Sequence, residues 1–148
     1  MTNKVAVISL DKRFEKFEEQ IKFISLKLLR ILNKTNVWVE IYLINNSRMK
    51  FLNKKFRSQN KTTTVLSFGE ARQFILPPSK FKKIGEIYLN VEVSSFKFQV
   101  SSLLIHGLLH LLGYEHQKKN DRIKMERVEQ KLFRQTPNPK PQTLNPKF

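Results

Sequence analysis

The sequence contains no cysteine, which excludes a disulfide scaffold, a thiolate metal site and a cysteine nucleophile. No apolar segment approaches the roughly 18 residues of a membrane-spanning helix. The apolar run at residues 5–10 is short and is followed at once by Asp11, Lys12 and Arg13, which does not fit a signal peptide. We therefore expect a cytoplasmic protein with no membrane partner.

Acidic residues are also few, and the charge is one-sided. The 12 Asp and Glu stand against 28 Lys and Arg, which gives a formal net charge of +16 at pH 7. Such a charge attracts anions and favours a polyanionic partner, with nucleic acid ahead of an anionic membrane. Solubility alone, or a genome rich in Lys and Asn codons, would also explain the charge.

The hydrophobic pattern predicts a single small α/β (α+β) domain with a sheet of about four strands packed with helices. The 148 residues are 40% hydrophobic and include 12 Phe, enough for a core. Strands are expected at 5–10, 37–44, 62–68 and 85–89, and helices at 14–29, 47–56, 98–112 and 120–133. Ser47 is the expected N-cap of the second helix, Asn33 and Gly113 are expected helix stops, and 69–83 is expected to be a loop.

The domain organisation follows from where the prolines lie. Four of the six prolines fall within residues 136–148. We expect residues 1–135 to form the domain and residues 136–148 to be a disordered basic tail rich in proline.

All three histidines lie in one eleven-residue stretch, HGLLHLLGYEH, at residues 106–116. His106 and His110 are four residues apart on one helix, so their Cβ atoms lie about 5–6 Å apart on one face. Gly113 lets the backbone reverse, which would bring His116 back as a third ligand. Three imidazoles with an open fourth position are typical of a catalytic zinc site. The alternative is three core histidines whose hydrogen bonds are satisfied by the backbone.

The histidine spacing also matches the metalloprotease pattern H-E-x-x-H-x-x-G-x-x-H, with one exception. Gly107 stands where such a protease carries its glutamate general base. A metallopeptidase is therefore a distant third interpretation, although a metalloprotease-like metal site at the end of a central helix remains our expectation.

These motifs resemble those of the YbeY family of metal-dependent endoribonucleases. The family signature H-G-x-L-H-L-x-G-Y-D-H is matched at residues 106–116, with Glu115 in place of Asp. Stretches similar to L-N-x-x-[YF]-R, P-T-D-V-L-S-F and G-D-I occur at 52–57, 62–68 and 85–87. The resemblance extends over residues 3–134 in order and spacing.

The resemblance implies a small α/β domain with a mostly antiparallel or mixed sheet. It implies that His106, His110 and His116 bind one Zn²⁺, or another divalent transition metal, per chain. The implied activity is a single-strand-specific endoribonuclease that acts in maturation of the 3′ end of small-subunit rRNA and in ribosome quality control. Its partners would be RNA, rRNA and the small ribosomal subunit.

This sequence departs from the family pattern at further positions besides Glu115. Thr62 and Thr64 replace a Pro and an Asp, and Gln99 stands where a Glu is usual. Losing the Asp would remove an outer-shell partner of the metal or a loop anchor. A non-catalytic RNA- or ribosome-binding factor with a structural metal is therefore the alternative function.

A basic segment suggests where RNA would bind. Residues 41–69 contain six basic residues and no acid. The family has an arginine important for RNA processing at the position of Arg57, and a guanidinium can hold a phosphate through two parallel hydrogen bonds. We predict Arg57 as catalytic and, as RNA contacts, Lys54, Lys55, Arg57 and Lys61. A solvated helix face is the alternative, and Glu115 and Glu86 are candidate general bases.

Overall fold

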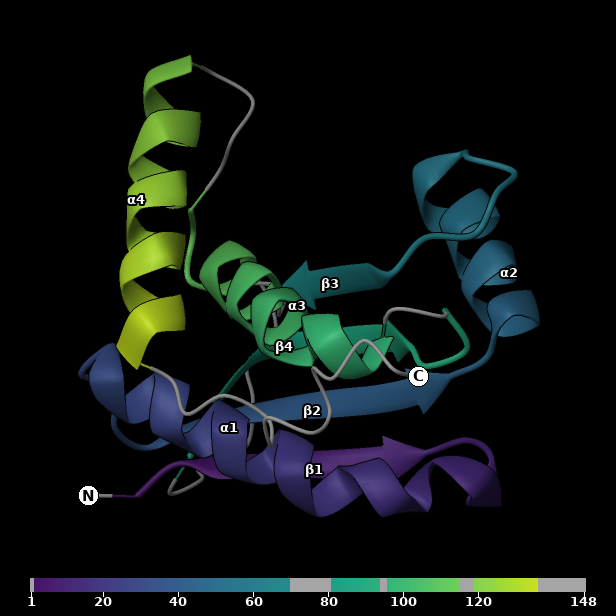
Figure 1. Ribbon diagram of the computed structural model, residues 1–148, viewed down its shortest axis with the longest axis horizontal. Helices are drawn as coiled ribbons and strands as arrows, with labels where there is room; N and C mark the ends of the chain where they lie inside the picture. Colours follow the sequence, from purple (N-terminus) through teal and green to yellow (C-terminus); the bar gives the residue numbers. More distant parts are fainter. Residues whose placement is uncertain (1, 70–80, 94–95, 115–118, 136–148) are drawn as a thin grey trace.

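A mixed four-stranded sheet organises the molecule (Figure 1). The computed structural model describes residues 2–69, 81–93, 96–114 and 119–135. The strands are β1 (Lys4–Ser9), β2 (Val37–Ile44), β3 (Val65–Gly69) and β4 (Lys82–Asn90), in the spatial order β1-β2-β4-β3. The predicted α/β domain with about four strands is confirmed.

Three of the four strands run parallel, so of the two expected arrangements, mostly antiparallel or mixed, the sheet has the mixed one. β1, β2 and β4 are parallel, and only β3 is antiparallel to its neighbour β4. The reason lies in the connections: a helical crossover separates β1 from β2, and such a crossover returns the chain in the same direction. In the strand order β1-β2-β4-β3, β3 forms one edge of the sheet.

The helices cover this sheet from one side and from its ends. They are the 3₁₀ helix η1 (Lys12–Phe17), α1 (Glu18–Ile31), α2 (Asn46–Arg57), α3 (Phe96–Leu111) and α4 (Lys119–Gln135). Figure 1 shows α1 and α3 in front of the sheet, α2 at one end of it, and α4 beside α3. Leu28 of α1, Leu104 and Leu108 of α3, and Ile41 and Ile87 of the sheet are fully buried and form the centre of the core.

Several predicted boundaries differ from the structure. The first helix begins with a 3₁₀ segment, and Asn45 rather than Ser47 caps α2 because its Oδ1 accepts from Arg48 N at 2.9 Å. β3 begins at Val65 instead of Thr62, and β4 begins at Lys82, inside the expected loop. Residues 70–80 and the expected tail, 136–148, lie outside the described residues. None of the described helices is long and apolar enough to cross a membrane.

Two glycines let α3 approach the sheet closely. A Cβ at Gly107 of α3 would lie 3.1 Å from Ile87 Cδ1. Gly85 of β4 has a φ of +152°, and a Cβ there would lie 2.4 Å from Phe68 O and 2.6 Å from Leu111 Cδ2. Larger residues would therefore push α3 away from β3 and β4. The close packing places the C-terminal half of α3 next to the edge strand.

Candidate functional site

The last two turns of α3 carry His106 and His110. The helix ends at a glycine in the left-handed region, as the sequence predicts: Gly113 has a φ of 98°. Gly113 N donates to His110 O at 3.1 Å, and Tyr114 N donates to Leu109 O at 2.9 Å. This pair of hydrogen bonds is a Schellman motif, which reverses the chain directly after the histidines.

The two imidazoles face each other on one side of α3. Their ring centroids are 4.4 Å apart, and the two Nε2 atoms are 3.0 Å apart. Two nitrogens bound to one tetrahedral zinc at its usual ligand distance would lie about 3.3 Å apart. The observed separation therefore fits a pair of ligands to one ion with little rearrangement.

The third predicted ligand, His116, lies outside the described residues, as does Glu115. Within the described ranges no three His, Cys, Asp or Glu side chains are grouped closely enough to hold a metal. The three-histidine site and its zinc therefore stay a prediction, which the geometry of His106 and His110 supports.

A carboxylate from α4 contacts the first histidine. Glu129 Oε2 lies 3.1 Å from His106 Nδ1, on the ring edge away from His110. Glu129 is not among the site residues predicted from the sequence. The available signal is its position between Met125 and Leu132, both buried, in an i, i+4, i+7 pattern, which places an acid on the face of α4 that packs inward.

Arg57 reaches the same region from the opposite side. It is the last residue of α2, which ends with Ser58 in the left-handed conformation (φ 58°). Arg57 Nη2 donates to Ser67 O of β3 at 3.0 Å, and the guanidinium lies 4.7 Å from the centre of the Phe68 ring. These contacts hold an exposed guanidinium against the edge strand, and its other N–H groups leave donors for an anion.

Arg57 and the histidines line one cleft of about 520 Å³. The cleft lies between β3 and the end of α3, and its lining residues are Arg57, Val65, Leu66, Ser67, Gly69, His106, His110 and Leu111. The structure thus brings together a predicted catalytic residue and two predicted metal ligands, which are about fifty positions apart in the sequence. A metal ion and an anionic group would both fit in this space.

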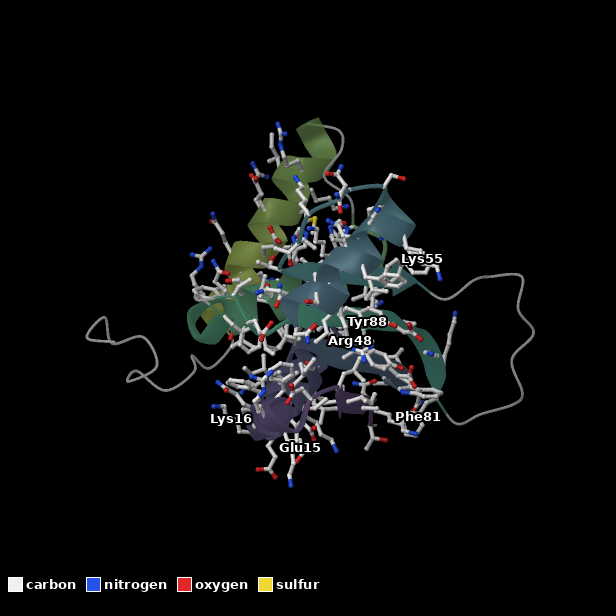
Figure 2. All side chains as sticks on the ribbon, turned by 90° about the vertical axis from the view of Figure 1, so that its right-hand side faces the viewer. Glu15, Lys16, Arg48, Lys55, Phe81 and Tyr88 are labelled. Carbon is white, nitrogen blue, oxygen red and sulfur yellow. The ribbon has the colours of Figure 1, made fainter. Side chains whose placement is uncertain are left out.

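The predicted lysine contacts do not line the cleft. Lys54 and Lys55 are exposed on α2, and Lys61 is exposed in the segment after it. Lys55 Nζ lies 5.3 Å from the ring of Phe56, which is itself 52% exposed. Figure 2 shows Lys55 extending outward from the side of the molecule that α2 occupies.

The segment that precedes β3 is firmly anchored despite its two threonine replacements. Asn90 is fully buried, and its Nδ2 donates to Thr62 Oγ1 at 2.9 Å and to Thr63 O at 3.2 Å. Asn90 N donates to Thr64 O at 3.0 Å, and Asn53 Nδ2 donates to Lys61 O at 2.9 Å. These hydrogen bonds hold the segment to the sheet without an aspartate at position 64.

Glu86 is badly placed to serve as a general base in the cleft. It alternates with Gly85 and Ile87, which face α3, so its side chain lies on the other face of the sheet. There its carboxylate accepts from Lys83 Nζ at 3.1 Å and from Tyr88 Oη at 2.9 Å. Its candidacy is wrong for this reason.

The outer face of the sheet holds a structural charge cluster around Lys83. Lys83 Nζ lies 3.0 Å from Glu40 Oε1. Burial by itself would raise the pKa of Glu40, but hydrogen bonds from Lys83 and Tyr42 outweigh burial and keep that pKa below its ordinary value. Burial, followed by the bond to Glu40, raises the pKa of Tyr42 to about 12. The charged and hydroxyl groups of this cluster bind one another, so we assign Glu40, Lys83 and Glu86 a structural role.

A comparison with known families decides what kind of protein carries this cleft. A family model described as Endoribonuclease YbeY matches residues 1–137. The chain belongs to the YbeY family. This confirms the resemblance drawn from the sequence motifs, three of which supply residues of the cleft.

Two relatives that carry the family name agree with the family match. The chain is 37% identical over 127 residues to Endoribonuclease YbeY of Pelagibacter ubique, covering 80% of each chain. It is 32% identical over 123 residues to the protein of that name from a Sulfurihydrogenibium species, covering 76% of this chain and 79% of the relative. A solution structure of a protein from Thermotoga maritima is 25% identical in sequence and superposes with a TM-score of 0.45. The match covers 88% of this chain and 90% of the Thermotoga chain.

The cleft lacks the glutamate general base of a metallopeptidase with the same histidine spacing. Gly107 occupies the position of that enzyme's glutamate, and it packs against Ile87 of β4. Because a Cβ there would lie 3.1 Å from Ile87 Cδ1, a glutamate at this position would require Ile87 to shift. In this chain, Gly107 therefore allows α3 to pack closely against β4.

Proposed function

We propose that this protein is a metal-dependent endoribonuclease that cuts single-stranded RNA in the cytoplasm. Its substrate class is rRNA, with the 3′ end of the small-subunit rRNA as the site of action and the small ribosomal subunit as partner. The observation that carries the proposal is the shared cleft: an arginine suited to a phosphate faces two histidines suited to a metal. Membership of a family whose relatives are named endoribonucleases supports the RNA substrate.

The residues of the cleft divide the chemistry between them. His106, His110 and, by the sequence pattern, His116 would hold the ion, which when bound polarises a phosphate oxygen or lowers the pKa of its water toward about 7. Arg57 binds a nonbridging phosphate oxygen and stabilises the negative charge that develops during cleavage. Its bond to Ser67 O fixes the guanidinium before RNA arrives. No described residue is assigned as the general base.

The experiment that tests the function is cleavage of a labelled single-stranded RNA by the full chain, as purified, after metal stripping and after restoring zinc. We expect cleavage, its loss on stripping and its return with zinc. Duplex RNA of the same sequence is the control substrate and should stay intact. Remetallated protein that binds the single strand without cutting it would overturn the nuclease assignment in favour of an RNA-binding factor with a structural metal.

A salt titration tests the three predicted lysine contacts. Replacing Lys54, Lys55 and Lys61 together with alanine should reduce the slope of log affinity against log salt by about 2, because each phosphate contact on a single strand contributes about 0.7. The matched control replaces Lys12, Lys16 and Lys22 of η1 and α1, and Figure 2 shows Lys16 far from Lys55. Equal slopes for the two triple variants would assign the binding to net charge alone.

A further inference from the structure

Glu129 of α4 is the one acidic side chain in contact with the candidate metal ligands among the described residues. Its Oε2 lies 3.1 Å from His106 Nδ1, and both side chains are about one-third exposed, at 29% and 35%. A carboxylate only accepts hydrogen bonds, so Nδ1 of His106 must carry the proton. In the neutral ring this leaves the lone pair on Nε2, the atom that faces His110 at 3.0 Å.

The contact couples two elements that are otherwise joined through hydrophobic packing. Met125 and Leu132 of α4 are buried in the core, and their packing fixes the position of α4 relative to α3. Glu129 lies between them on the same face, so its carboxylate is directed at His106 by the packing of the whole helix. The chain contains 28 Lys and Arg that could pair with an acid. Glu129 nevertheless contacts the imidazole of His106.

We propose that Glu129 is the positioning residue of the metal site: it fixes the tautomer and the ring orientation of His106 so that Nε2 is available as a ligand. The inference rests on the proposed metal site. Carboxylates that hold the second nitrogen of a ligating histidine raise its basicity, and removing one weakens metal binding by roughly 10–100-fold. Glu129 does not touch RNA or the reacting atoms in this role.

The test measures zinc affinity by competition with a chelator in Glu129→Ala, Glu129→Gln and Glu126→Ala. Glu126 is an exposed acid on the same helix, so its variant controls for charge and helix propensity. We expect Glu129→Ala to bind zinc about 10–100-fold more weakly. Glu129→Gln, which keeps a neutral acceptor, should lie between it and the wild type. Glu126→Ala should match the wild type.

A second readout separates positioning from a merely structural tie between α3 and α4. Nitrogen NMR of the metal-free protein should show the Nδ1–H tautomer of His106 in the wild type and in Glu129→Gln, and a mixture of tautomers in Glu129→Ala. If the alanine variant does not fold, the zinc affinity of Glu129→Gln decides the test, because its neutral amide is a weaker acceptor than a carboxylate. An affinity equal to that of the wild type would then overturn the inference.

The outcomes distinguish this inference from the proposed function. Equal zinc affinity in Glu129→Ala and Glu126→Ala, with the wild type binding zinc, would overturn the role of Glu129 and leave the nuclease assignment standing. A wild type that binds no zinc would overturn the metal site and this inference with it. Zinc binding that depends on Glu129 in a protein that does not cut RNA would support the inference and refute the nuclease.

Discussion

Replacing His110 with alanine is expected to remove the metal from the protein and, with it, RNA cleavage. His110 Nε2 and His106 Nε2 lie 3.0 Å apart, so each supplies one ligand of the proposed set. Losing one of three ligands should weaken binding by more than the roughly 10–100-fold that an outer-shell residue contributes. Metal content by plasma mass spectrometry should fall from about one zinc-like ion per chain to a small fraction of that.

The control for His110→Ala is Ser102→Ala, an exposed position on the same helix. Both variants should be measured untagged, because a histidine tag binds metal itself. Circular dichroism should show a folded protein in each case, since the buried leucines of α3 are unchanged. Stoichiometric metal retained by folded His110→Ala would show that His106 and His110 are not a ligand pair.

Replacing Arg57 with lysine is expected to slow RNA cleavage by about 10²–10³-fold while metal content stays at the wild-type level. The factor is that of losing one preorganised donor to the transition state. Lysine keeps the positive charge but loses the planar fork that holds phosphate through two hydrogen bonds. It also loses the bond from Nη2 to Ser67 O, which fixes the guanidinium beside the cleft.

Arg48→Lys is the matched control for Arg57→Lys. It makes the same chemical change on the same helix, in the first turn of α2, at an exposed residue that does not line the cleft. Single-turnover cleavage of a single-stranded RNA, with thermal unfolding measured alongside, compares the two. Equal rates in the two variants would mean that Arg57 contributes charge and nothing specific to the reaction.

Much of the local structure could be read from residue spacing. The strands and helices were predicted from periods of two and of three to four residues, and Gly113 from its preference for a left-handed helix end. The pairing of His106 with His110 followed from the pitch of one helix. The predictions that were wrong concern the ends of elements. Asn45, and not Ser47, caps α2. The strand expected from Thr62 begins at Val65, and the side chain of Asn90 donates hydrogen bonds to Thr62 and Thr63 before it.

The sequence by itself determined the elements, the basic segment and the histidine pair, because each depends on neighbours within one turn or one strand. Only the tertiary structure decided that β1, β2 and β4 run parallel, that Arg57 meets the histidines across β3, and that Glu129 reaches His106. The strand directions depend on the connections between the strands, and the meeting of the cleft residues depends on how α3 packs against the sheet and how α4 packs against α3. Such contacts join residues tens of positions apart, and the short-range periodicity of side chains carries no information about them.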